Sequence, residues 1–172
     1  MRVVLIIAIV LLSSTAFTQT KVGFTNVELI MYYMPETEMV SSQLERFENT
    51  EKEAMRTKEA DYSKLYQEYT MKKQEGSFSS SEAEINLIKK VESLQREINV
   101  FYENWEYRYN AKKNELMQPI LTRLQAAIDA VAEENGYTYI LNQTSGSNIL
   151  YGVAQYDVTN LIAAKLGISI PN

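Results

Sequence analysis

The stretch that decides the fold is residues 36–75, which read ETEMVSSQLERFENTEKEAMRTKEADYSKLYQEYTMKKQE. It contains neither Gly nor Pro, the two residues least compatible with a helix interior. A heptad-like spacing with one four-residue stutter runs along it. The positions on that face are Val40, Leu44, Phe47, Glu51, Ala54, Lys58, Tyr62, Leu65 and Tyr69. Because Glu51 and Lys58 interrupt the apolar positions, the pattern predicts a long helix that makes a poor tight coiled coil.

A second long helix is predicted after the turn GSFSSS at 76–81. Gly76 suits the left-handed end of the first helix, and Ser81 is predicted to cap the second, with Glu84 completing a capping box. This second helix should end before Gly136 and kink near Pro119. Its apolar stripe comprises Ile85, Ile88, Val91, Leu94, Ile98, Phe101, Trp105, Leu116, Ile120, Leu121, Leu124, Ala127, Ile128 and Val131. Two long helices joined by so short a turn should be antiparallel neighbours.

The two ends of the chain predict a small β-containing head. Residues 21–27, 137–142 and 148–153 have the two-residue period of strands, and the turn at 144–147 predicts that the last two form a hairpin. Asp157 is predicted to cap a final helix that presents Leu161, Ile162 and Leu166 on one face. The expected fold class is α+β: a small β-rich head of residues 21–35 plus 116–172, with a long projecting antiparallel αα-hairpin, a coiled-coil-like arm, at 36–115.

Residues 1–18 have the pattern of a secretory signal peptide. Arg2 precedes an unbroken apolar run, Val3–Leu12, and small residues follow, which predicts cleavage somewhere within 16–20. The run is too short to span a bilayer as a helix, which needs about 20 residues. A retained N-terminal anchor is the alternative interpretation. The mature chain is expected to be soluble, with no integral membrane segment.

The composition excludes several kinds of chemistry. The chain has no Cys and no His, so it can form no disulfide, no zinc site of Cys or His type and no Ser-His-Asp triad. We therefore predict no catalytic residue, no metal site and no cofactor. The formal net charge of −5 argues against nucleic acid as a partner, because such a partner needs a basic face. The acidic segment 36–51 should steer acidic partners weakly or repel them.

The order of these elements resembles the OmpH-like (Skp-like) family of periplasmic chaperones. The residues that carry the resemblance are Lys21–Asn26 after a signal peptide, the helical hairpin, 128–132 with Tyr137–Asn142, and Tyr156–Thr159 opening a last helix. The resemblance implies a homotrimer whose heads join and whose arms enclose a cavity for unfolded outer-membrane proteins. A head with so few strands cannot bury its own edges. The residues expected at the trimer head are Val22, Phe24, Ile140, Ile149 and Leu150.

The arms are rich in aromatic residues, for which two interpretations stand. Most of these rings could simply fill the seam between the helices, whereas those beside the seam could contact clients, because Tyr combines an apolar face with a polar tip. The candidate client-binding residues are Tyr62, Tyr66, Tyr69, Tyr102, Trp105 and Tyr107. Tyr66, Tyr102 and Tyr107 lie beside the seam and are the preferred candidates. The expected function is that of an ATP-independent holdase chaperone in the periplasm. The alternative is a structural coiled-coil envelope protein, such as a spacer or a stalk.

Overall fold

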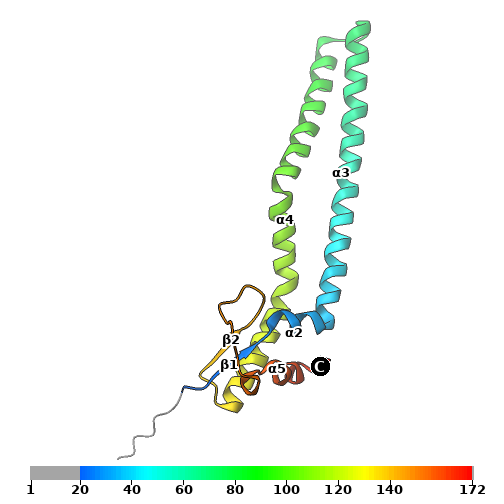
Figure 1. The fold of residues 1–172 in the computed structure, drawn as a ribbon. Coiled ribbons are helices and arrows are strands. Elements are labelled where there is room, and N and C mark those ends of the chain that lie inside the picture. The colour runs from blue at the N-terminus through cyan, green and yellow to red at the C-terminus, as the bar shows by residue number, and fades with distance from the viewer. Residues whose placement is uncertain (1–19, 172) are drawn as a thin grey trace, which may run out of the picture. The chain divides into compact units, whose positions relative to one another are not determined.

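The computed structural model describes residues 20–171 of the chain. The signal peptide expected over 1–18 lies outside this range. The elements follow in the order β1 (Val22–Thr25), α2 (Val27–Tyr33), α3 (Pro35–Glu75), α4 (Ser81–Asn135), β2 (Tyr139–Asn142), the short 3₁₀ helix η1 (Ala154–Tyr156) and α5 (Thr159–Leu166) (Figure 1). The α+β class with a long helical hairpin is confirmed. None of the described helices contains a stretch both long and apolar enough to cross a membrane.

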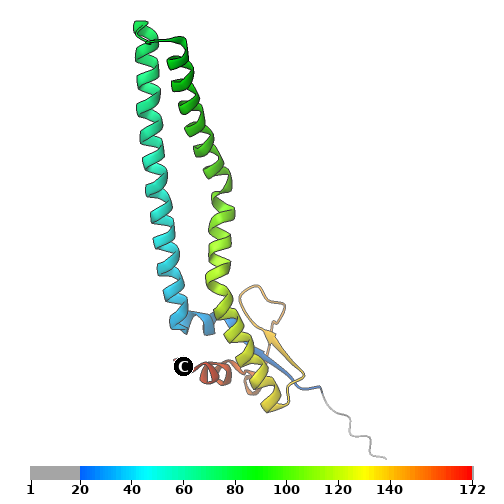
Figure 2. The same cartoon turned by 180° about the vertical axis from the view of Figure 1, so that it is seen from behind.

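The described residues divide into two compact units. The head unit comprises 20–31 and 124–171, and the hairpin unit comprises 32–123. In the hairpin unit α3 and α4 run side by side and antiparallel, as both views show (Figures 1 and 2). Gly76 ends α3 in the left-handed conformation at φ 62°, and its N–H bonds back to carbonyls of the last turn. These features confirm the predicted helical hairpin.

The capping residue predicted for the second helix differs from the one in the structure. The Oγ atom of Ser80, not of Ser81, accepts the N–H of Ala83 at 3.1 Å, so the predicted cap was wrong by one residue. Three serines in a row each offer the same hydroxyl, and only the local backbone geometry selects among them. Helix α4 continues through Pro119 to Asn135, and Gly136 ends it at φ 67°. The kink at Pro119 stays a prediction.

The predicted hairpin of strands is wrong. Strand β2 pairs with β1 in parallel, in the register Val22↔Tyr139 to Thr25↔Asn142, which is possible because a long helical connection separates them. Residues 148–153 form no strand. The other edge of β1 is taken by Asp157 and Val158, whose N–H donates to the Phe24 carbonyl at 2.9 Å. The sheet of the described chain therefore has two strands, and the head unit is less rich in strand than expected.

Residues 148–153 pass over β1 as irregular chain, which Gly152 permits. A Cβ atom at this position would lie 2.4 Å from the Phe24 ring, so only glycine allows the ring so close. On β1 itself the predicted alternation is confirmed. Gly23 and Thr25 are buried, whereas Val22 is 39 % exposed and Phe24 is half-buried.

The core of the head unit is closed by α2, the C-terminal part of α4 and α5. The apolar side chains buried in this unit are Ile30, Leu124, Ala127, Val131, Val158, Ile162, Ala163 and Leu166. One buried polar contact joins distant segments: Thr159 Oγ1 lies 3.3 Å from Thr25 Oγ1 and accepts the Asn26 N–H. Leu161 is 46 % exposed, so the predicted inward face of α5 included one residue too many.

The Asp157 carboxylate lies at the start of α5. It accepts the N–H of Thr159, the first residue of that helix, at 2.9 Å. The predicted capping contact is therefore present, although Asp157 stands one residue before the N-cap position, which Val158 occupies.

Candidate functional site

The hairpin unit contains a stack of aromatic rings. The Trp105 ring of α4 lies 6.1 Å from the Phe47 ring of α3, with 9° between their planes. It also lies 5.8 Å from Phe101 and 5.9 Å from Tyr109. Aromatic pairs at such distances stabilise by about 0.5–1.5 kcal/mol beyond the area they bury. The stack therefore joins the two helices beside the position where Glu51 interrupts the apolar face of α3.

The two charged residues of the predicted seam are partnered across the hairpin. Glu51 Oε1 accepts a hydrogen bond from Arg108 Nη2 of α4 at 2.7 Å, and its side chain is only 19 % exposed. Lys58 donates to Glu97 of α4. These ion pairs replace apolar contacts at two levels of the hairpin. The seam is thus interrupted as the sequence predicts, and each interruption has its own partner.

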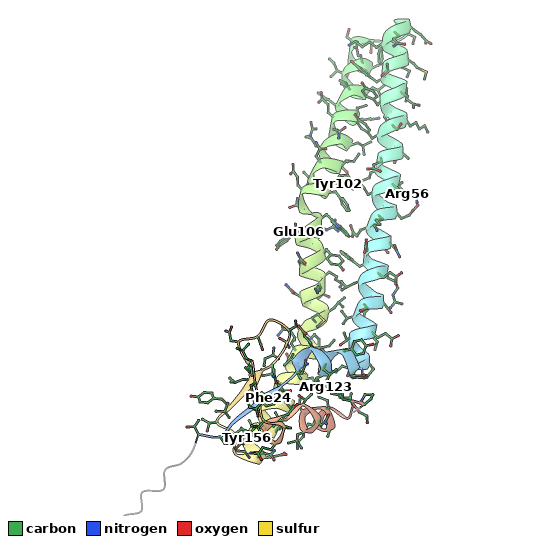
Figure 3. The ribbon with its side chains drawn as sticks, viewed as in Figure 1. Phe24, Arg56, Tyr102, Glu106, Arg123 and Tyr156 are labelled. Carbon is green, nitrogen blue, oxygen red and sulfur yellow. The ribbon has the colours of Figure 1, made fainter. Side chains whose placement is uncertain are left out.

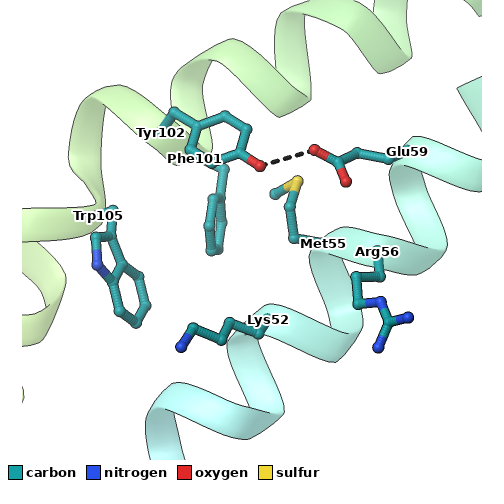
Figure 4. Close-up of a pocket in the computed structure, with 7 residues that line it drawn as sticks. All are labelled: Lys52, Met55, Arg56, Glu59, Phe101, Tyr102 and Trp105. Atoms are coloured by element: carbon teal, nitrogen blue, oxygen red, sulfur yellow. Dashed lines mark hydrogen bonds between the residues drawn. The ribbon is translucent and has the colours of Figure 1, made fainter.

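Between these two ion pairs, cavities open on both sides of Met55. The first, which we call the Trp105 cavity, has a volume of about 250 Å³. Its lining residues are Lys52, Met55, Arg56 and Glu59 of α3 and Phe101, Tyr102 and Trp105 of α4 (Figure 4). The second, about 630 Å³, is also lined by Met55 and Phe101, and in addition by Tyr107 and Arg108. Because Met55 and Phe101 line both cavities, only a thin layer of side chains fills the hairpin at this level.

The ring of Tyr102 is held at the Trp105 cavity by its hydroxyl group. Tyr102 Oη donates to Glu59 Oε1 of α3 at 2.7 Å, and Figure 4 shows this bond crossing from one helix to the other. The bond raises the pKa of Tyr102, because a phenolate would face the Glu59 carboxylate. The hydroxyl therefore remains a neutral donor at physiological pH. The contact fixes the orientation of a ring that is otherwise 58 % exposed.

The candidate client-binding residues fall into two groups by exposure. Tyr66, Tyr102 and Tyr107, placed beside the seam by the sequence pattern, are 49 %, 58 % and 76 % exposed. The other three, Tyr62, Tyr69 and Trp105, are half-buried. The exposure follows the predicted position of these rings in or beside the seam, and client binding by them stays a prediction.

These six residues do not form one patch. Tyr102 and Trp105 line the Trp105 cavity, and Tyr107 lines the larger one. Tyr62 stacks on Tyr66 with 5.9 Å between the ring centroids. Tyr69 lies near the turn of the hairpin, where its ring is 6.0 Å from Phe78.

The buried position of Met55 was not predicted from the sequence. The seven-residue spacing assigns Ala54 to the inward face, but Ala54 is exposed and Met55 is only 4 % exposed. A helix with 3.6 residues per turn drifts by about 20° per heptad relative to such a spacing, and three turns counted from the buried Leu44 end closer to residue 55 than to residue 54. Applying the 3.6-residue period from Leu44 onward would have favoured Met55.

The end of the hairpin near its turn is fastened by charge. Lys73 of α3 donates to Glu84 of α4 at 2.8 Å and to its own neighbour Tyr69, and these contacts raise the pKa of Lys73. Along α3, Lys72 donates to Glu68 at 2.7 Å and lowers the pKa of that carboxyl. Among the residues that the structure describes, no group of acidic side chains could hold a metal ion.

The head unit exposes a second set of large apolar side chains. The exposed members in the sheet and in the segment after it are Val22, Tyr139, Leu141, Leu150, Tyr151, Val153 and Tyr156. Of the predicted trimer-head residues, Leu150 is 96 % exposed and Val22 39 %, whereas Phe24, Ile140 and Ile149 are half-buried. A cavity of about 250 Å³ opens between Phe24, Leu141 and Tyr151. Five of the exposed residues were not predicted for this surface: Tyr139, Leu141, Tyr151, Val153 and Tyr156.

Comparison with known proteins adds a family to this geometry. The family model described as outer membrane protein (OmpH-like) matches residues 21–166. The chaperone protein Skp of Photorhabdus luminescens is 28 % identical over 148 residues, which cover 86 % of each chain. The crystal structure of an OmpH-like protein from Caulobacter crescentus CB15 is similar with a TM-score of 0.67, over 84 % of this chain and 82 % of that one. At 10 % identity that likeness concerns the fold alone. With its family model matched from the first strand to the last helix, the chain belongs to the OmpH-like outer membrane protein family.

Proposed function

We propose that this protein is a periplasmic, ATP-independent holdase chaperone that binds unfolded outer-membrane proteins and prevents their aggregation. The observation that carries the proposal is the set of exposed aromatic rings on a hairpin whose seam is interrupted, in a chain of the OmpH-like family. A relative in that family is named a chaperone. The contacts offered by these rings are non-covalent, so the proposal includes no enzymatic step and no cofactor.

The mechanism follows from what an unfolded barrel strand exposes. Such a strand presents alternating apolar side chains and unpaired backbone groups, which drive aggregation through strand edges. Tyr rings offer a large contact area at a low entropic cost and carry a polar tip that tolerates water. Many weak contacts within one enclosure retain a client through effective concentration. Release requires only that the client reach a more stable state in the membrane.

We further propose that three chains assemble through their head units, so that the hairpins enclose the client. Support comes from Leu150 and Tyr151, which are 96 % and 82 % exposed in the single chain. Within the described residues β2 has β1 as its only strand neighbour, so its other edge is free to pair. Exposed apolar residues next to a free strand edge are typical of an association surface.

Assembly is tested by Leu150→Asp. Because this side chain is almost fully exposed in the single chain, the substitution should not affect folding, but it should place a charge inside the interface. Sedimentation of the mature protein at micromolar concentration should give a trimer for the wild type and a monomer for the variant. Asn148→Asp, in the same segment, is the matched control and should remain trimeric. A stable monomeric wild type would refute the assembly.

Chaperone activity is tested by diluting a urea-unfolded outer-membrane protein and following light scattering. The mature protein should suppress the scattering without nucleotide. The alternative, a spacer or stalk, predicts no suppression at any ratio of the two proteins. A uniformly apolar seam would favour the alternative, and the ion pairs of Glu51 and Lys58 count against it.

A further inference from the structure

The Trp105 cavity has the walls of a site for one aromatic ring. Trp105 is held between Phe47 and Phe101, whose ring centroids lie 6.1 and 5.8 Å away, and Tyr102 is held by its bond to Glu59. Walls that are fixed before a ligand arrives reduce the entropy lost on binding. These walls form the cavity in the single chain, and Figure 4 shows three rings of α4 facing side chains of α3.

The size of the cavity suits a single side chain. It measures about 250 Å³, whereas an engineered protein cavity of about 150 Å³ is enough to bind benzene. One aromatic side chain of an extended polypeptide therefore fits, with little room for a second. The Met55 sulfur group adds an adaptable surface that makes favourable contacts with aromatic rings.

The charges at the cavity favour an aromatic ring over an aliphatic side chain of the same size. Lys52 and Arg56 line the α3 side, with Arg56 at the level of Tyr102 of α4 (Figure 3). Within the described residues their ion pairs are with Glu48 and Glu53, one turn away on the same helix. Such exposed pairs are weak and easily rearranged. The one acid of the lining, Glu59, is engaged by Tyr102. A cation beside a ring is attracted by the negative face of the π system, which an aliphatic group lacks.

Cation–ring contacts of this kind already occur elsewhere in the same hairpin. The Arg108 guanidinium lies 5.4 Å from the centroid of Phe101, and the Lys73 ammonium lies 5.3 Å from that of Tyr69.

We propose that the Trp105 cavity is an anchoring site for a single aromatic side chain of an unfolded client, selected over aliphatic side chains by Lys52 and Arg56. This inference rests on the proposed function and adds the class of client residue that the hairpin recognises.

The chain contains its own reporter for the test, because Trp105 is its single Trp. The probe is a Gly- and Ser-based peptide with one central Phe, compared with the same peptide carrying cyclohexylalanine or Ala. Cyclohexylalanine has the shape of Phe without its π system. Trp105 emission, excited where Phe does not absorb, is recorded during titration of the full mature protein at physiological salt. The Phe peptide should bind about threefold or more tightly than the cyclohexylalanine peptide, the scale of one exposed cation–ring contact, and the Ala peptide should produce no change.

The variant Lys52→Ser/Arg56→Ser should remove this preference and leave the two ring peptides equal or the cyclohexylalanine peptide ahead. The control variant Lys89→Ser/Lys113→Ser removes the same charge from two exposed sites outside the cavity. It should retain the preference for the Phe peptide. Circular dichroism establishes that both variants are folded. If the wild type binds the cyclohexylalanine peptide as tightly as the Phe peptide, or more tightly, the inference is refuted. It is also refuted if the Phe peptide leaves Trp105 emission unchanged, or if both double variants lose the preference for Phe equally. The light-scattering test remains independent, so suppression of aggregation without a Phe preference would refute the site and leave the proposed function standing.

Discussion

In the head unit, Ile30, Val158 and Ile162 have no exposed surface, whereas in the hairpin unit the Trp105 ring is half-buried and Tyr107 is three-quarters exposed. The head unit fills a continuous interior with small and branched apolar residues. The hairpin unit alternates buried residues such as Val91 and Ile98 with ion pairs, stacked rings and cavities. The difference is one of packing: the head unit has a continuous buried interior, whereas the hairpin unit leaves cavities between its two helices.

Removing most of the hairpin should abolish the proposed chaperone activity. Replacing residues 46–112 by a short turn should leave the head unit folded, because its buried residues lie within 20–31 and 124–171. Suppression of aggregation in the light-scattering assay should be lost completely. Circular dichroism and sedimentation report whether the shortened protein is folded and assembled. Full suppression by the shortened protein would place the client surface elsewhere.

The hairpin was well predicted from sequence because its signals are local. Helix-forming residues run without interruption through α3, and Gly76 and Gly136 end α3 and α4. Each of these signals acts through the local backbone. The partner of β2 was predicted wrongly because strand pairing depends on distant residues. The turn at 144–147 indicated a hairpin, but β2 pairs in parallel with β1, which precedes both long helices in the chain, and residues 148–153 form no strand.

The site was predicted in part for a similar reason. The helical period alone indicates that Tyr66, Tyr102 and Tyr107 lie beside the seam. The Trp105 cavity depends on how Met55 of α3 meets Phe101 of α4, which neither helix specifies by itself. The partners of Glu51 and Lys58 likewise lie on α4, more than thirty positions away along the chain.

A matched pair of core substitutions measures how firmly the two units are packed. Ile162→Ala in the head unit should cost near the upper part of the range of about 2–5 kcal/mol for such changes, because this side chain is wholly buried. Ile98→Ala in the hairpin unit should cost near the lower part of this range, because in a pair of helices neighbouring side chains surround Ile98 on fewer sides. Hydrogen exchange measured by mass spectrometry, with peptides from each unit, gives both values. Equal costs would mean that the hairpin is packed as firmly as the head.

The ion pairs of the hairpin provide a finer test. Arg108→Ala leaves Glu51 largely buried without its cation and should destabilise the hairpin by about 1–3 kcal/mol. Lys112→Ala breaks a pair with Glu115, three residues along the same helix, and should cost under about 1 kcal/mol. Urea unfolding followed through Trp105 emission compares the two variants. If both lose the same small amount, the cross-hairpin pair does not support the seam.

Near the turn of the hairpin we expect only a weak sensitivity to acid. Lys72 lowers the pKa of Glu68, so this contact stabilises the folded hairpin above the ordinary glutamate pKa of about 4.3 and is lost as the pH falls through the lower folded value. Hydrogen exchange of peptides around 64–76 should therefore accelerate as the pH falls below about 4.3, after correction for intrinsic exchange. Glu68→Gln should flatten this dependence, and Glu82→Gln should keep it. An unchanged slope in Glu68→Gln would assign the sensitivity to other acids.

We propose that exposed aromatic rings of the hairpin hold the client. The decisive experiment is a titration of a labelled, unfolded outer-membrane protein at low and at physiological salt. The variant Tyr66→Ser/Tyr102→Ser/Tyr107→Ser is compared with the wild type and with Gln67→Ser/Asn110→Ser/Asn114→Ser, a control at exposed polar positions of the same helices.

We expect the wild-type affinity to stay unchanged or to improve slightly with salt, because exposed charges are screened within about 8 Å at physiological salt and the chain is acidic, with a net charge of −5. The Tyr variant should bind more weakly by about 1–3 kcal/mol, the scale of losing a few partly buried aromatic contacts, and the control should match the wild type. A steep loss of affinity with salt, together with no effect of the Tyr substitutions, would show instead that charge pairing holds the client.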